Sequence, residues 1–206
     1  MPTCFARTVP ILCCLAALVP GRAVAGDSPR AVIERLTGEV LAVLGNASLP
    51  SDEKRRQIEN LVYADTDFET LSRLVLARNW SRFTAEQQTE FMQAFKRHLA
   101  LTYGKNIENY KNERVAVESE REEAHGDWMV KTEFVRGGAD NIEIDYRLRR
   151  RDDRWTIIDF IVENVSLVAN YRAQFQDILG GGSPERLLQL LREKNASGTP
   201  LKAPGA

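Results

Sequence analysis

The spacing of apolar residues changes near residue 115 of this chain of 206 residues, and that change constrains the possible folds most. Up to residue 110, apolar residues recur every three or four positions, which is the repeat of helices with one buried face. From Val115 to Val162 they alternate with polar residues, which is the repeat of strands. The sequence therefore predicts an α+β fold in which most helices precede a sheet.

Cap residues and apolar stripes mark the predicted helices. Ser28 followed by Pro29 is a typical helix start, and Thr84 with Gln87 three residues later forms a capping-box pair. The predicted helices cover residues 29–45, 68–75, 84–110, 166–179 and a segment that starts at 183. The charged segment 51–60 has no predicted element. The longest helix carries an apolar stripe that contains Phe91, Phe95, Leu99, Tyr103, Ile107 and Tyr110.

Four segments show the strand pattern, at 115–122, 128–134, 142–149 and 155–162. Short turns join the last three segments, so we expect them to pair antiparallel with their neighbours. In the last strand Ile157 and Ile161 share one face, and the other face carries Ile158, Phe160 and Val162. The expected architecture is a curved antiparallel sheet of about four strands, with helices packed on its concave face and an apolar pocket between them.

The first 25 residues have the pattern of a cleaved signal peptide. Arg7 precedes an apolar run from Val9 to Val19, and Ala23-Val24-Ala25 is a small-x-small cleavage sequence. The run is too short for a permanent membrane anchor. Cleavage after Ala25 would remove two of the 28 basic residues and none of the 29 acidic ones, which leaves an exported soluble protein of net charge −3.

Residue content excludes several classes of protein. All three cysteines lie in the first 14 residues, so the mature chain would contain none. With His98 and His125 as its two histidines, the chain is not expected to bind a metal. The nearly neutral charge argues against nucleic-acid binding. We expect a single domain at 26–195, followed by a flexible tail at 196–206.

Five short segments follow one another in a specific order: VLARNW (75–80), FMQAFKRHLALTYGKNI (91–107), DYRLRRRDDRWTIIDF (145–160), SLVANYRAQF (166–175) and LLREKN (190–195). Their succession resembles the MlaC family, the soluble periplasmic lipid carriers of the pathway that maintains outer-membrane lipid asymmetry. This family is also known as the toluene-tolerance auxiliary proteins. Where the family often has a glycine before the Ser-Leu pair, this chain has Asn164-Val165.

The resemblance implies a periplasmic carrier that binds a phospholipid by its acyl chains. The carrier would move lipid between an outer-membrane lipoprotein complex and an inner-membrane ABC transporter complex. Exposing two acyl chains of roughly 15 methylenes each to water costs on the order of 20 kcal/mol, so lipids cross an aqueous gap very slowly without a carrier. The implied protein is not an enzyme and has no catalytic residues, no metal and no cofactor. Phospholipid is its cargo.

In this scheme the lipid-binding residues lie on the long helix, on the inner face of the strands and at the start of the following helix. Periodicity alone equally allows these stripes to form a solid core, as in an interaction module without a pocket. The expected lipid-binding residues are Phe91, Phe95, Leu99, Tyr103, Val130, Thr132, Phe134, Ile144, Tyr146, Leu148, Ile157, Ile161, Val165, Val168 and Tyr171.

Two polar features allow alternative interpretations. Asp159 lies between Ile157 and Ile161, so it could be the general base of a small-molecule enzyme, or a structural acid paired with Arg172. A dense basic cluster is either a solvated hairpin tip or a contact surface for phosphate head groups or a docking partner. The cluster consists of Arg147, Arg149, Arg150, Arg151 and Arg154.

Overall fold

The computed structural model describes residues 27–104, 113–136 and 140–201. The predicted signal peptide therefore lies outside the described residues. The same holds for Ile107 and Tyr110, for the turn at 137–138 and for residues 202–206 of the predicted tail.

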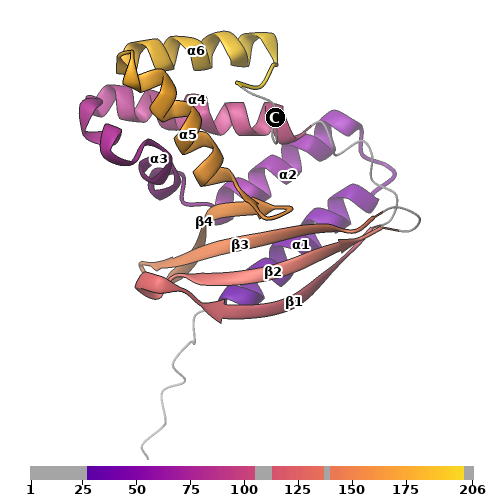
Figure 1. Cartoon of the computed structure of the whole chain (residues 1–206). Coiled ribbons are helices and arrows are strands. Elements are labelled where there is room, and N and C mark those ends of the chain that lie inside the picture. Colours follow the sequence, from indigo (N-terminus) through magenta and orange to yellow (C-terminus); the bar gives the residue numbers. More distant parts are fainter. Residues whose placement is uncertain (1–26, 105–112, 137–139, 202–206) are drawn as a thin grey trace, which may run out of the picture.

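Helices occupy both ends of the described chain and strands lie between them (Figure 1). The helices are α1 (Pro29–Gly45), α2 (Ser51–Asp65), α3 (Phe68–Leu76), α4 (Ala85–Tyr103), α5 (Leu167–Gly180) and α6 (Pro184–Ser197). Two 3₁₀ turns are η1 (Ala77–Arg82) and η3 (Ala124–Gly126). The strands are β1 (Arg114–Glu122), β2 (Trp128–Val135), β3 (Ile142–Arg151), β4 (Arg154–Val162) and β5 (Val165–Ser166).

The five strands form one antiparallel sheet in the order β1-β2-β3-β4-β5. This confirms the predicted α+β class, and β5 adds a fifth strand of two residues to the expected four. Tyr146 lies opposite Val130 on β2 and opposite Phe160 on β4. Because directly opposed residues point to the same side of a sheet, these three side chains share one face, which we call the inner face.

A β-bulge in β4 changes which of its residues reach the inner face. Arg147 pairs with Asp159, but the next residue, Leu148, pairs with Ile157, so the register shifts by one residue. Beyond such a shift the alternation is inverted. Phe160 and Val162 therefore share the inner face with Ile157, whereas Ile161 points to the opposite side. The prediction that Ile157 and Ile161 share one face of the strand is therefore wrong, because the bulge lies between them.

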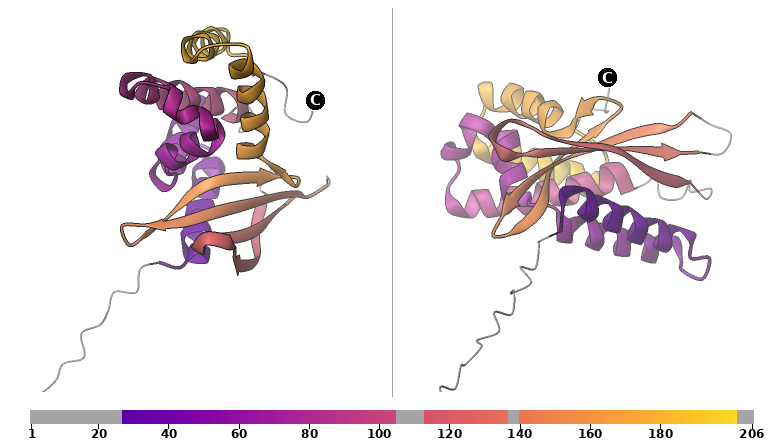
Figure 2. Two further views of the ribbon diagram at one scale, coloured as in Figure 1. Left: turned by 60° about the vertical axis from the view of Figure 1, so that its left-hand side comes forward. Right: turned by 90° about the horizontal axis from the view of Figure 1, so that it is seen from below.

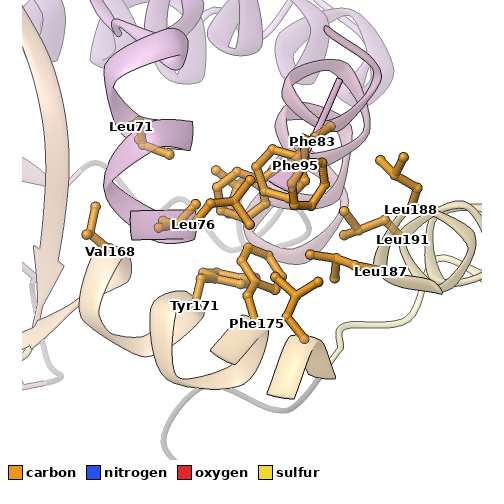
Figure 3. Packing of buried hydrophobic residues seen from close by; sticks show 14 of the residues in the cluster. Leu71, Leu76, Phe83, Phe95, Val168, Tyr171, Phe175, Leu187, Leu188 and Leu191 are labelled. Carbon is orange, nitrogen blue, oxygen red and sulfur yellow. The ribbon is translucent and has the colours of Figure 1, made fainter. Parts of the chain in front are cut away.

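The hydrophobic interior consists of two clusters. In the first, α3 to α6 enclose a helical core in which Phe95 stacks against Phe91 and meets Tyr171 and Phe175 edge to face (Figure 3). In the second, Val32, Ile33 and Leu36 of α1 pack on the inner face of the sheet, against Val130, Tyr146, Leu148 and Ile157. Half-buried Phe160 packs against both clusters.

The two groups of helices lie in different places relative to the sheet (Figure 2). The helices α3 to α6 gather beyond one edge of the sheet, next to β4, whereas α1 and α2 run side by side along it. The predicted tail begins later than expected, because Ala196 and Ser197 end α6. Leu201 then packs against the helical core, so the chain after α6 also contributes buried surface.

Candidate functional site

A cavity of about 630 Å³ lies between α1, α2, α4 and the inner face of the sheet. Its volume is in the range of sites for small ligands. Most of its wall is aliphatic or aromatic. The residues that line it are Leu44, Ile58, Glu59, Val62, Tyr63, Phe68, Leu99, Ala100, Tyr103, Gly104, Glu113, Phe134, Arg136, Ile142, Ile144, Tyr146, Phe160, Val162 and Leu167.

The sheet supplies one side of the cavity from three neighbouring strands. Phe134 is paired with Ile142, and Ile144 is paired with Val162, so these four side chains stand together on the inner face. The register of the strands thus brings together apolar residues that lie up to 28 positions apart in the sequence. A continuous apolar floor results, and its position depends on the bulge in β4.

The helices supply the opposite side of the cavity. Ile58 and Val62 are four residues apart on α2, and Leu99 and Tyr103 are four residues apart on α4. This spacing places each pair on one face of its helix. Both helices therefore present an apolar stripe to the sheet.

Tyr63 and Phe68 form an aromatic part of the wall, and Lys96 of α4 contacts both rings. Their rings meet edge to face with centroids 5.4 Å apart. The ammonium of Lys96 lies 3.7 Å from the centre of the Tyr63 ring and 5.3 Å from that of Phe68. Such cation–π contacts hold α2 and α3 to α4. Burial raises the pKa of Tyr63 to about 12, so its hydroxyl stays neutral.

The other tyrosines of the wall are neutral as well. Burial raises the pKa of Tyr103 and the pKa of Tyr146 above the usual range. Tyr103 also forms a side-chain hydrogen bond with Tyr171 of the helical core. Within the described part of the chain, the acidic and basic residues of the wall are Glu59, Glu113 and Arg136.

The structure places five of the fifteen expected lipid-binding residues on the cavity wall. They are Leu99, Tyr103, Phe134, Ile144 and Tyr146. Phe91, Phe95, Val168 and Tyr171 lie in the helical core, and Val130, Leu148 and Ile157 lie in the core under α1.

The remaining three expected residues have other environments. The buried hydroxyl of Thr132 donates a hydrogen bond to the carbonyl oxygen of Ile144 at 2.6 Å. Ile161 points away from the inner face, and Val165 is 47% exposed. Which of the fifteen residues contact a lipid stays a prediction.

Of the fourteen wall residues that the sequence did not indicate, four come from α2 and two from the shifted end of β4. The helix α2 begins with charged residues that pair with one another, Arg55 with Asp52 and Arg56 with Glu53. This charged half conceals a helix whose apolar residues stand in its second half. The spacing of Ile58 and Val62 was a signal that could have revealed it.

Asp159, the candidate general base, does not line the cavity. It is 1% exposed, and it accepts hydrogen bonds from the Ser166 hydroxyl at 2.6 Å and from the Val168 amide at 3.0 Å. Burial raises the pKa of Asp159, and these hydrogen bonds oppose the rise. The expected partner Arg172 instead donates to the carbonyl oxygen of Leu74 at 2.9 Å. Asp159 is therefore a structural acid with partners other than the predicted one.

The basic cluster is largely neutralised by acids close to it. Arg149 forms a bidentate pair with Asp127 at 2.7 and 2.9 Å, and Arg151 lies 3.2 Å from Asp67. None of the five arginines of the cluster lines the cavity. These contacts favour the interpretation of a solvated hairpin tip. Residues 27–104, 113–136 and 140–201 contain no group of three potential metal ligands.

An open antiparallel sheet and covering helices that enclose an apolar cavity define a class of α+β domains with an internal ligand pocket. The family model described as MlaC protein matches residues 34–193 of this chain. The chain therefore belongs to the MlaC family, as the sequence segments indicated.

Two relatives are similar to most of the chain. The toluene tolerance protein ttg2D of Pseudomonas putida is 25% identical over 174 residues, which cover 80% of this chain and 79% of that protein. A solved structure of a phospholipid-binding protein from Ralstonia solanacearum, in complex with a phospholipid, is 26% identical with a TM-score of 0.76. The match covers 84% of this chain and 99% of the Ralstonia chain. No helix among the described residues is long and apolar enough to cross a membrane.

Proposed function

We propose that this protein is a phospholipid carrier that holds acyl chains in the cavity between α1, α2, α4 and the sheet. The observation that supports it best is the apolar wall of that cavity. The fold shared with the phospholipid-bound Ralstonia protein supports the same ligand. The carrier would act in the periplasm after removal of residues 1–25, with residues 26–195 as its lipid-binding domain. It would pass lipid between an outer-membrane lipoprotein complex and an inner-membrane ABC transporter complex.

The cavity is large enough for a substantial part of a lipid. With about 30 Å³ for each methylene, close to the volume of one water molecule in the liquid, 630 Å³ holds roughly 21 methylenes. Burial of about 0.8 kcal/mol per methylene then contributes on the order of 17 kcal/mol. This value is comparable with what acyl chains gain inside a bilayer. Transfer between membrane and carrier can therefore be nearly balanced.

A carrier needs no catalytic step, and the placement of Asp159 agrees with this proposal. The carboxylate lies outside the cavity wall and is bound by Ser166 and Val168. An apolar substrate in the cavity would therefore not meet it. The enzyme hypothesis thus has no specific observation in its favour.

Adjacent residues of β4 offer a matched test of the cavity. Val162→Trp places a large side chain in the cavity, where the indole competes with the acyl chains for space. We therefore expect the amount of phospholipid bound per protein molecule to fall about fivefold or more. Ile161→Trp adds a similar bulk on the opposite side of the sheet and should leave the lipid content unchanged. Solvent extraction of the purified proteins, followed by phosphorus assay and mass spectrometry, measures both.

The wild-type protein decides the proposal first. Purified protein that contains no phospholipid, and takes up none from liposomes, would refute the carrier function. Equal lipid content in the two tryptophan variants would show that lipid binds elsewhere.

A further inference from the structure

Aromatic rings are concentrated in the wall of the cavity. Among the described residues, six of the nineteen that line it are aromatic, whereas aromatic residues make up 8% of the chain. Burial of acyl chains requires only apolar surface, which aliphatic side chains supply equally well. The excess of rings is therefore not explained by acyl chains. The aromatic wall residues are Tyr63, Phe68, Tyr103, Phe134, Tyr146 and Phe160.

Four of these rings form two pairs that join different elements. Tyr63 of α2 meets Phe68 of α3 edge to face, with centroids 5.4 Å apart and ring planes at 82°. Tyr146 of β3 and Phe160 of β4 oppose each other in the sheet and meet at 5.7 Å and 68°. In this geometry the positive edge of one ring contacts the negative face of the other. A further ring inside the cavity can extend either pair in the same way, whereas a saturated ligand cannot.

The hydroxyl groups of two wall tyrosines have partners outside the wall. Tyr146 forms a side-chain hydrogen bond with Thr132, and Tyr103 forms one with Tyr171. Neither Thr132 nor Tyr171 lines the cavity. A ligand therefore does not have to supply a hydrogen bond to these tyrosines, and their rings remain as apolar contact surface.

The size of the cavity suits small rings. An apolar cavity of about 150 Å³ in a protein interior stays dry and binds benzene. The cavity of this protein has a volume of about 630 Å³, so it has room for more than one ring of that size. Binding of a small aromatic molecule therefore needs no change in the fold.

We infer that the cavity binds small aromatic hydrocarbons as a second class of ligand, with their rings packed edge to face against Tyr146 and Phe160 and against Tyr63 and Phe68. Each ring contact adds to the effect of burial and raises the affinity about two- to tenfold over that of a saturated ring of the same size. This inference goes beyond the proposed carrier function and does not depend on it, because the wall alone supplies the contacts.

Benzene and cyclohexane are matched test ligands, because both are small hydrocarbon rings without polar atoms. The mature protein is freed of lipid and exposed to each ligand through the vapour, at the same low fraction of its saturated pressure. Both ligands then have the same activity relative to their pure liquids, so their different solubilities in water cancel. Gas chromatography of the solution, with a protein-free blank subtracted, measures the ligand bound. The wild type should bind about two- to tenfold more benzene than cyclohexane.

Two leucine variants test the assigned rings. Phe160→Leu and Phe68→Leu each remove one ring and keep the wall apolar, so each should lower the ratio of bound benzene to bound cyclohexane about twofold or more. Phe83→Leu is the matched control. Phe83 is buried in the helical core, where it meets Phe91 edge to face, and it does not line the cavity. This variant should keep the wild-type ratio. Circular dichroism confirms that every variant is folded.

Each outcome decides the inference separately from the carrier function. Equal binding of the two ligands by the wild type, or binding of neither, overturns it. A ratio that both wall variants leave unchanged, or that Phe83→Leu lowers as much as they do, overturns it as well. A preference for benzene that falls in at least one wall variant and persists in Phe83→Leu supports the aromatic site. The carrier function is decided by the phospholipid content of the purified protein, which none of these measurements uses.

Discussion

His98 shows how a single enclosed residue can make the stability of this protein depend on pH. The side chain is 1% exposed, its Nδ1 lies 3.2 Å from Oδ1 of Asn195, and its Nε2 accepts a hydrogen bond from the Leu201 amide at 3.3 Å. An accepting Nε2 assigns the proton to Nδ1, so the ring is neutral. Burial lowers the pKa of His98 below its ordinary value of 6.5.

This arrangement predicts that acid weakens the fold. Below pH 6.5 the unfolded chain binds a proton at His98 while the folded chain does not, so the free energy of unfolding falls as the pH falls. The loss of stability ends at a pH below the lowered pKa of His98 in the folded protein, where the folded form binds the proton as well. The slope is at most about 1.4 kcal/mol per pH unit for one proton. Urea denaturation at pH 7.5, 6.5 and 5.5 measures it.

His98→Gln isolates the contribution of this imidazole. The glutamine can still donate to Asn195 and accept from Leu201, but it does not titrate. We expect a shallower dependence of unfolding free energy on pH than in the wild type. His125→Gln, which changes an exposed histidine of η3, serves as the control. A slope that His98→Gln leaves unchanged would assign the acid sensitivity to other groups.

Among the elements, the start of α5 depends on one hydroxyl with two functions. Ser166 caps α5 by accepting a hydrogen bond from the Ala169 amide at 3.0 Å, and it donates to the buried Asp159. Ser166 is also part of β5, where it pairs with Ile161 of β4. Ser166 therefore joins the last helices to the sheet.

Ser166→Ala should cost more stability than the loss of an ordinary helix cap. Loss of the cap costs about 1 kcal/mol, and an unsatisfied buried carboxylate oxygen adds about 1–3 kcal/mol. Ser183 caps α6 through the Arg186 amide at 3.3 Å and forms no bond to a buried acid, so Ser183→Ala should cost only about 1 kcal/mol. Urea denaturation of both variants at pH 7.5 compares the two losses. Equal losses would mean that the bond to Asp159 contributes nothing.

The element pattern was largely predictable because strands and amphipathic helices leave direct periodic signals. The strand at 142–149 was found within two residues of β3, since its faces are cleanly apolar and charged. The helix α2 was missed because its charged first half hides the apolar residues that follow. The inner face of β4 was assigned incorrectly beyond Ile157, because an inserted residue inverts the alternation and leaves no mark in the composition.

At the scale of the whole molecule, the cavity itself could not be derived from periodicity. Phe95 and Leu99 belong to one apolar stripe of α4, yet Phe95 fills the helical core and Leu99 lines the cavity. Residues of the same type at the same spacing thus have different surroundings, which the packing of distant elements decides. For this reason five of the fifteen expected residues line the cavity and ten lie elsewhere, and which of them contact a lipid stays a prediction.

Removal of bound lipid should make the protein less stable. A ligand that binds only the folded form adds about 2.7 kcal/mol when its free concentration is a hundred times its Kd. For a domain of this size, that gain corresponds to a rise in Tm of roughly 5–10 °C. Thermal unfolding followed by circular dichroism, before and after extraction and after reloading, measures the shift. Val162→Trp should show almost none, and an equal shift in that variant would contradict the assigned cavity.

The wall of the cavity is assembled from residues as far apart as Leu44 and Leu167. Contacts between such distant segments close late, because long loops must first be ordered. Leu167 begins α5, which follows every long strand of the sheet. A chain synthesised only as far as β4 therefore lacks part of the wall, and the complete wall requires α5 to pack against the sheet.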